Sequence, residues 1–465
     1  MNNRLSSPTI LAGAGSVDIT PAMGIQIAGD IGRYRPVEEI RDPLFAKALV
    51  IEAAGKTVCW LSLDVLAISR KWADEIKKQA AARYGLDPAA IMVHVVQNHA
   101  APSVGHFFVF DEDDWGLFPR EYPWLLGGDD SYNLGFVEGV LQAIGKALHS
   151  RQPAAVKVGR GVDGRVAFNR RFVMRDGSGR THPGRCNPDV LYCEGPMDPE
   201  AGVMTFTAEN GQIFAALLHH TCHPVHGYPQ RWISAGWPGA WCNGVNELLG
   251  GNCVAMLVNG FCGNIHHNNH LDPNYKDDYQ AMGQKLTETT ATVLKNMAPV
   301  QTPILEWRTQ SLQIPLRSPT DQEVQDARRL LKAHPQPIWK DAAKTAVEWD
   351  WVYAAMRIDL AKHVKRTPLF DYPIQVFRLG NTALVSVPGE PFVEEQLRIK
   401  LASPAAFTFM AHMSNSYVGY IPTLQAFARG GYETHTGAGS KLAPEALGTI
   451  GDAVIGMLKE LFPQT

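Results

Sequence analysis

Hydrophobic and polar positions divide the chain into short apolar runs and longer stretches with the amphipathic spacing of helices. Apolar runs bounded by turn residues predict buried strands at 45–52, 57–62, 91–96, 156–160, 166–169, 213–218, 253–258, 304–314, 373–379, 383–387 and 407–413. Helical spacing predicts helices at 71–84, 134–149, 279–297, 320–334, 340–365, 391–402 and 443–461. Strands interspersed with helices predict an α/β fold of mixed β-sheets flanked by helices.

Two long segments lack this periodicity. Residues 106–135 are rich in aromatic, acidic and proline residues, which indicates an ordered loop at the rim of a site or a surface excursion over apolar area. Residues 175–201 form a loop rich in Gly, Pro and Cys. Because no Pro/Ser-rich linker or charge run divides the chain, we expect one domain over 1–465.

An internal duplication is one hypothesis for how this domain is built. A hairpin, a strand that ends in an acid, a helix and a strand that ends in polar residues follow one another in 45–102, and the same order recurs in 373–420.

Composition narrows the class of protein. A hydrophobic content of 45% and a charged content of 19% are typical of a compact folded chain. The net charge of −3 gives no argument for nucleic acid or anionic membranes, and no apolar run reaches membrane-spanning length, so we expect a small-molecule substrate as partner. The first twenty residues lack signal-peptide character, and seven cysteines without CxxC spacing indicate buried thiols. We therefore expect a cytoplasmic protein, or a secreted one if a leader was trimmed.

The candidate chemistry is concentrated between residues 217 and 273, which hold seven of the sixteen histidines. The predicted strands 213–218 and 253–258 each end there in a burst of polar residues. Ligand sites of α/β proteins commonly lie at the carboxyl ends of strands. Three or so His and carboxylate ligands from distant strand ends can hold a catalytic zinc that keeps one position open for water. The pattern therefore indicates an enzyme active site with a metal.

Each candidate also has a simpler structural explanation. A single histidine behind a strand is more often a hydrogen-bonded structural residue, and the run of histidines at 266–270 is also compatible with capping of the following helix. The tryptophans near this stretch either pack in the core or form a platform for a sugar or other ring; they are Trp115, Trp124, Trp232, Trp237 and Trp241.

Short motifs in a fixed order extend over essentially the whole chain. They are Ala-Gly-Ala-Gly-Ser-Val-Asp-Ile-Thr-Pro at 12–21, Asn-His-Ala-Ala-Pro at 98–102, Asn169-Arg170, Cys222-His223-Pro224 with Ile233-Ser234, Asn264, Pro388-Gly389-Glu390, Tyr420-Ile421-Pro422-Thr423 and Tyr432-Glu433. This ordered set resembles the N-terminal catalytic domain of the neutral/alkaline (non-lysosomal) ceramidases. The resemblance implies that fold, a hydrolase activity, and a zinc ion held by His223, Glu390 and Tyr420. It also implies that Arg170 and Tyr432 face the substrate. We expect no counterpart of the family's C-terminal immunoglobulin-like domain.

Two departures from the family pattern matter for the chemistry. A zinc-binding histidine of the family falls on Gln97, and only the next histidine of that motif remains, as His99. The catalytic serine of the family falls on His266. Zinc is then held by His223, Glu390 and Tyr420 with His99 or Gln97, or it recruits His266, His226 or His94, or the metal is lost. We do not expect ceramidase activity.

Three functions stay open on these grounds. The first is a zinc-dependent hydrolase of an amide, ester or related bond in a compact polar substrate, with His266 or His99 as general base or acid and Arg170 and Tyr432 as oxyanion donors. The second is a carbohydrate-active hydrolase or lyase that uses His, Tyr and carboxylates for acid–base catalysis; the available carboxylates are Asp64, Glu390 and Glu433. The third is a non-catalytic binding protein on an enzyme scaffold.

Overall fold

Three main sheets make up the fold in the computed structural model, which describes residues 10–30, 32–110, 114–300 and 304–463. The first has the order β5 (Ile91–Val95), β4 (Lys56–Leu63), β3 (Phe45–Ala53), β1 (Leu11–Asp18) and β6 (Gln152–Pro153). The second has the order β15 (Val254–Asn259), β13 (Ile213–His220), β12 (Glu200–Thr207), β7 (Ala155–Val162) and β17 (Ala298–Pro299). The third has the order β18 (Leu305–Pro315), β19 (Leu369–Leu379), β20 (Thr382–Ser386) and β22 (Phe407–Ala411).

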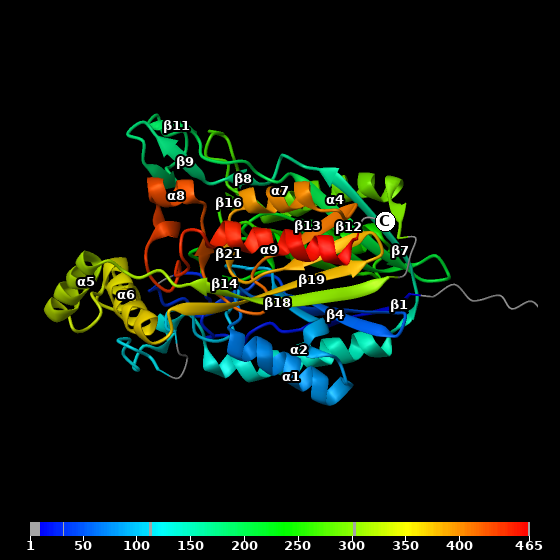
Figure 1. Ribbon diagram of the computed structural model, residues 1–465, viewed down its shortest axis with the longest axis horizontal. Helices are drawn as coiled ribbons and strands as arrows, with labels where there is room; N and C mark the ends of the chain where they lie inside the picture. The colour runs from blue at the N-terminus through cyan, green and yellow to red at the C-terminus, as the bar shows by residue number, and fades with distance from the viewer. Residues whose placement is uncertain (1–9, 31, 111–113, 301–303, 464–465) are drawn as a thin grey trace, which may run out of the picture.

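Helices flank these sheets (Figure 1), as the pattern of the sequence predicts. The first sheet packs against α1 (Arg70–Tyr84) and α2 (Asp130–His149). The second packs against α3 (Gly236–Leu248) and α4 (Tyr279–Val293), and the third against α7 (Val393–Ala402) and α9 (Ala446–Leu461). The predicted fold class, mixed sheets flanked by helices, is confirmed.

Each sheet contains the same sequence of elements. Two antiparallel strands are followed by a helix and then by a strand parallel to the second one; the units are β3-β4-α1-β5, β12-β13-α3-β15 and β19-β20-α7-β22. A helix is the usual crossover between parallel strands. A shared topology says nothing of ancestry, so the internal duplication stays a prediction.

The last strands of the three units meet at a buried polar junction. His94 on β5 accepts a hydrogen bond through Nε2 from the backbone N–H of Asn259 on β15 (3.1 Å), and its Nδ1 lies 2.7 Å from the carbonyl oxygen of His412, directly after β22. The backbone N–H of His412 in turn donates to the Asn259 carbonyl (3.1 Å). The segments that follow β5, β15 and β22 therefore start from one point.

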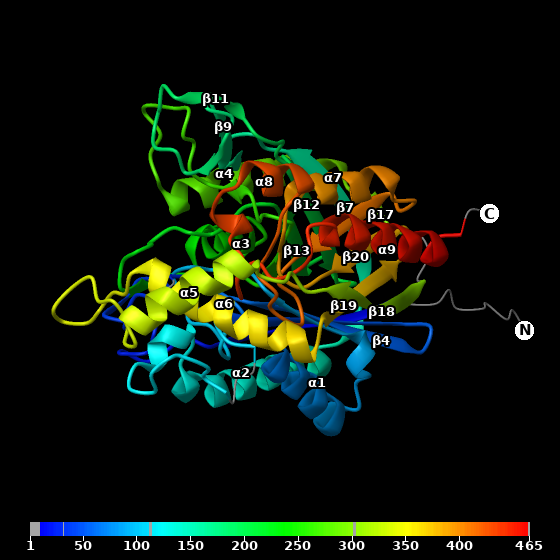
Figure 2. The same cartoon turned by 60° about the vertical axis from the view of Figure 1, so that its left-hand side comes forward.

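A helical insertion stands apart from the sheets. It lies between β18 and β19 and contains α5 (Asp321–Ala333) and α6 (Trp349–Arg366), which project to one side in Figure 1 and lie in front in Figure 2. Thr320 and Glu323 form a capping box that starts α5. The predicted helix 340–365 is wrong in its first part, because Trp339 and Val347 pair as an antiparallel bridge and the helix begins only at Trp349.

Several other elements were not predicted from the sequence pattern. Helix α3 was not predicted because its Gly-Trp-Pro-Gly start lacks helical spacing, although Pro is well tolerated in a first turn. Strand β12 was also missed, and the 175–201 segment contributes β10 (Gly179–Thr181) and β11 (Val190–Cys193) to a small sheet with β9 (Arg171–Met174). Within the described part of the chain, no helix is long and apolar enough to cross a membrane.

Candidate active site

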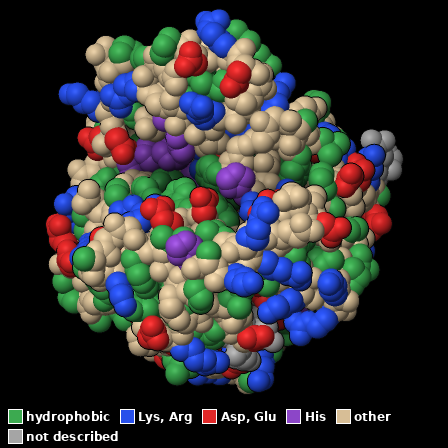
Figure 3. All heavy atoms as spheres, turned by 90° about the vertical axis from the view of Figure 1, so that its left-hand side faces the viewer, with side chains coloured by type: hydrophobic (Ala, Val, Ile, Leu, Met, Phe, Trp, Pro, Cys, Tyr) green, Lys and Arg blue, Asp and Glu red, His purple; other side chains and the backbone are tan. Residues whose placement is uncertain are grey.

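A cavity of about 510 Å³ opens on the face of the molecule shown in Figure 3, where histidine side chains gather in the hollow. This volume is within the range of small-molecule sites. All but one of the predicted site residues line it: Gln97, His99, Arg170, His266, Glu390, Tyr420 and Tyr432. The exception, His223, is fully buried, and its Nε2 lies 3.5 Å from Glu390 Oε2. The structure thus brings the predicted residues to one place, while their roles stay predictions.

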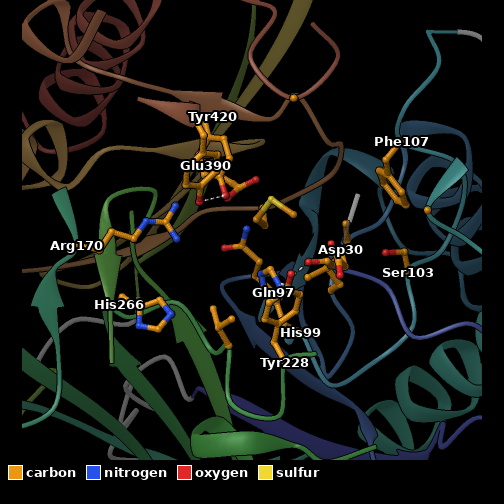
Figure 4. Close-up of a pocket in the computed structure, with 18 of the residues that line it drawn as sticks. Asp30, Gln97, His99, Ser103, Phe107, Arg170, Tyr228, His266, Glu390 and Tyr420 are labelled. Carbon is orange, nitrogen blue, oxygen red and sulfur yellow. Dashed lines mark hydrogen bonds between the residues drawn. The ribbon is translucent and has the colours of Figure 1, made fainter. Parts of the chain in front are cut away.

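These residues lie at or directly after the ends of strands. Gln97 and His99 follow β5, and His223 follows β13. Glu390 starts the short strand β21 (Glu390–Pro391), which pairs in parallel with β23 (Tyr420–Ile421), so that Glu390 and Tyr420 are register partners. Figure 4 shows Arg170 and His266 facing Glu390, Tyr420 and Gln97 across an open space.

Two backbone positions next to the site are unusual. Gln97 has φ +67°, a conformation that side chains with a Cβ rarely adopt, and such outliers cluster at functional sites. Gly389 has φ +74°, and a Cβ there would come within 2.7 Å of the Gly419 carbonyl oxygen. A glycine before Glu390 therefore permits the close approach of β21 to β23.

Hydrogen bonds at Nδ1 determine the tautomers of His99 and His223. His99 Nδ1 lies 3.1 Å from the Gly29 carbonyl, and His223 Nδ1 lies 2.9 Å from the Cys262 carbonyl. A carbonyl can only accept, so both neutral rings carry their hydrogen on Nδ1 and leave a lone pair on Nε2. Both Nε2 atoms are buried without a hydrogen-bond partner among the described residues, and the ring centroids are 5.2 Å apart.

The carboxylate of Glu390 faces the same point. Its Oε2 is buried without a hydrogen-bond partner in the described structure, and its Oε1 accepts a long hydrogen bond from Tyr417 (3.5 Å). Burial raises the pKa of Glu390 to about 7, against the lowering effects of the Gln97 hydrogen bond, Arg170 and Tyr420. Burial also lowers the pKa of His99 to about 3, with a further contribution from Arg35. Two of these unsatisfied atoms, His223 Nε2 and Glu390 Oε2, thus lie 3.5 Å apart, and His99 Nε2 lies on the same cavity but farther away.

His266 has the opposite tautomer. Its Nδ1 accepts a hydrogen bond from the backbone N–H of Asn268 (2.9 Å), so the neutral ring carries its hydrogen on Nε2. Burial, together with the neighbouring His267 and His182, holds the pKa of His266 well below its usual range. At neutral pH this side chain is therefore a hydrogen-bond donor and has no free lone pair to act as a base.

Arg170 supplies a fixed positive charge on the same wall. Its Nη2 donates to the Gly263 carbonyl (2.6 Å), and its Nε lies 3.3 Å from Glu433. The guanidinium carbon is 5.5 Å and 5.4 Å from the ring centroids of Tyr420 and Tyr432, whose hydroxyls share a hydrogen bond of 3.1 Å. The charge and both hydroxyls are thereby held beside the cavity.

Some sequence candidates lie elsewhere. His94 uses both ring nitrogens at the strand junction and is not available as a ligand. Asp64 accepts from the Phe45 backbone N–H, and Glu433 accepts from Thr181 and Arg171. Trp237 and Trp241 are fully buried, so these two tryptophans pack in the core and do not form a platform for a sugar or other ring. Of the rim loop, Phe107 and Phe108 reach the cavity lining, but Trp115 and Trp124 do not.

The other wall of the cavity was missed by sequence reasoning. Trp349, Tyr353 and Met356 come from α6, and their i, i+4 and i+7 spacing marks one face of that helix. Asp30 and Asp277 also line the cavity, and no local sequence signal distinguishes them from other loop acids.

Comparisons with known proteins point to one fold. No protein-family model matches the chain. The neutral ceramidase of Pseudomonas aeruginosa is 23% identical over 220 residues, a match that covers 46% of this chain but only 29% of that protein's length. The crystal structure of neutral ceramidase from Pseudomonas aeruginosa superposes with a TM-score of 0.72 at 20% identity over 99% of this chain and 76% of that one. A ceramidase complexed with C2 gives a TM-score of 0.72 at 18% identity over 98% and 75%. The chain has a neutral ceramidase-like fold, as its motifs predicted.

Proposed function

We propose that this protein is a zinc-dependent hydrolase that cleaves an amide, ester or related bond in a compact substrate other than ceramide. The observation that carries the proposal is the convergence of His223 Nε2 and Glu390 Oε2, two buried atoms 3.5 Å apart that have no hydrogen-bond partner among the described residues. Lone pairs this close are unfavourable unless a cation or a proton lies between them.

The donor set at this point fits a zinc ion. Ligand atoms about 2.0–2.1 Å from zinc lie roughly 3.3 Å apart in a tetrahedron, close to the His223–Glu390 separation. Tyr420 is the register partner of Glu390, and Gln97 hydrogen-bonds Glu390, so these two would complete the ligand set. A bound zinc would lower the pKa of water and polarise a carbonyl oxygen.

The residues around this point would have separate catalytic roles. His99, with a free Nε2 in the cavity, would accept a hydrogen bond from the attacking water and orient it. Arg170 would stabilise the negative charge that develops on the carbonyl oxygen, and Tyr432 would donate a hydrogen bond to it. His266, locked as an Nε2–H donor, would bind the same oxygen or protonate the leaving group, but it would not replace a serine nucleophile.

The cavity also constrains the substrate. A polar floor of His99, Arg170 and His266 faces an apolar wall that includes Trp349, Tyr353 and Met356. The volume of about 510 Å³ suits a compact molecule that carries the scissile carbonyl next to a small apolar or aromatic group.

Metal content and hydrolysis together test the proposal. We expect one zinc at His223 and Glu390, hydrolysis of some members of a panel of N-acyl amides and aryl esters, and loss of both on chelation. His223→Ala and Glu390→Gln should abolish zinc binding there and lower kcat/KM at least about 100-fold. His149→Ala and Glu209→Gln, at exposed positions, are matched controls and should change neither. Full hydrolytic activity in the metal-free enzyme would refute the proposal.

The carbohydrate-active alternative is less well supported. It needs a pair of carboxylates flanking the scissile bond. Asp64 and Glu433 are engaged in buried structural contacts, which leaves Glu390 as the one of the three predicted carboxylates that faces the cavity.

A further inference from the structure

Two histidine side chains lie close to one carboxylate oxygen beside the His223–Glu390 site. His226 Nε2 lies 3.0 Å and His267 Nε2 lies 2.9 Å from the same oxygen, Asp277 Oδ1. The two imidazole rings stack with centroids 3.6 Å apart and an interplanar angle of 17°. Among the described residues, this is the one set of three His, Cys, Asp or Glu donors whose ligand atoms all lie within 4.8 Å of one another.

Hydrogen bonding to Asp277 leaves His226 only partly satisfied. His226 is 3% exposed, and neither of its ring nitrogens has a hydrogen-bond partner in the described structure, although Asp277 is within range. The distance is right, but the direction is not that of an N–H donor. A buried ring nitrogen of His226 therefore remains for another partner, such as a cation.

His267 supports the same conclusion. Its Nδ1 lies 3.4 Å from the His223 carbonyl, which can only accept a hydrogen bond, and its Nε2 lies 2.9 Å from Asp277. Without an ion Nε2–H donates to that carboxylate, and with the hydrogen on Nδ1 the Nε2 lone pair can bind an ion next to Asp277. A backbone carbonyl that holds Nδ1–H while Nε2 ligates an ion is the usual outer-shell arrangement of metal-binding histidines.

We infer that His226, His267 and Asp277 bind a divalent transition-metal ion of the zinc class, at a site separate from His223 and Glu390. Two imidazoles and one carboxylate are a donor set that suits such ions, and donors about 3 Å apart match ligand bonds of roughly 2.0–2.1 Å. Three protein ligands leave a position for water or for an oxygen of a bound molecule.

The site is accessible from the cavity and is held by packed loops. His267 and Asp277 line the cavity, and the Asp277 side chain is 51% exposed. A Cβ at Gly227, next to His226, would overlap the Trp232 ring, so this loop has little freedom to move. His226 follows His223 by three residues and His267 follows His266, so both candidate sites are built on the same two loops. The inference uses only His226, His267 and Asp277 and does not depend on the proposed function.

Zinc stoichiometry of single-site variants tests the inference. The full-length protein is stripped with a chelator, dialysed against Zn²⁺, and analysed by inductively coupled plasma mass spectrometry and by calorimetric titration with Zn²⁺. In the His223→Ala variant we expect one remaining zinc per chain. Adding Asp277→Asn or His226→Gln to that variant should remove it and weaken Zn²⁺ binding at least about 100-fold. Asp130→Asn, which removes a carboxylate that pairs with His106, is the matched control and should leave the stoichiometry unchanged.

The two sites give separable outcomes. If zinc binding is lost in His223→Ala but unchanged in Asp277→Asn and His226→Gln, the inference is overturned and the proposed function stays intact. If zinc binding is lost only in Asp277→Asn and His226→Gln, the inference is supported and a metal at His223 is not. Because Asp277 is half exposed, Asp277→Asn should fold even if His226→Gln does not, and circular dichroism with a melting curve in Zn²⁺-free buffer checks this. Unchanged stoichiometry in folded Asp277→Asn overturns the inference.

Discussion

Acid should destabilise this protein through His94, the histidine at the junction of β5, β15 and β22. In the folded state the ring accepts from the Asn259 N–H at Nε2 and donates from Nδ1 to the His412 carbonyl. A second proton on Nε2 would point at that N–H. Burial lowers the pKa of His94 to about 4, only partly offset by the His412 hydrogen bond.

The sign and size of this acid destabilisation follow from proton linkage. The unfolded chain binds the proton near the ordinary pKa of about 6.5, so between about pH 6.5 and 4 it binds more protons than the folded state, and stability falls as the pH falls. Between pH 7.5 and 4.5 this one histidine should remove about 2.5 kcal/mol from the free energy of unfolding.

The comparison of wild type with His94→Gln isolates this contribution. Glutamine keeps one hydrogen-bond partner at the junction, so we expect the variant to be less stable by about 1–3 kcal/mol at pH 7.5. At pH 4.5 the gap should narrow by about 2.5 kcal/mol, because the variant has no proton to take up. Urea unfolding at both pH values measures this, with the exposed His149→Gln as control. Parallel pH profiles for wild type and His94→Gln would refute the reasoning.

Two further substitutions probe how the site is held. Arg171→Met should cost about 3–5 kcal/mol, because Arg171 and Glu433 form a fully buried pair at 2.7 Å and the carboxylate would lose its nearer arginine, keeping Arg170 at 3.3 Å and Thr181. Adding Glu433→Gln should restore part of this loss, and urea unfolding that shows no recovery would contradict the pairing argument. Gly389→Ala should lower both the melting temperature and the zinc binding proposed at Glu390, because φ is +74° and the new Cβ would crowd Val418. The exposed Gly211→Ala, also at positive φ but with open space around it, controls for backbone strain alone, and equal effects of the two variants would show that crowding is not the cause.

Local pattern was sufficient for most of the sheets and helices. Strands such as β4 and β13 are apolar runs bounded by turns, and α1 ends where Gly85 adopts φ 69°. The prediction failed where long-range packing overrides periodicity. The Trp237 side chain is buried in the core next to His220, and packing of this kind, not helical spacing, explains the apolar residues of α3.

The sequence by itself determined which residues follow the strand ends, because strand direction and alternation are local properties. Only the resemblance to a known family indicated that Gln97, His99, His223, Glu390 and Tyr420 would meet, because they follow strands of different sheets. Only the tertiary structure decided what each side chain can do. The chemistry of a histidine depends on which of its nitrogens faces a carbonyl, and those carbonyls come from Gly29 for His99, Cys262 for His223 and His412 for His94, all distant in sequence. For the same reason, Asp277 is an ordinary loop acid in the sequence and the meeting point of two histidines in the fold.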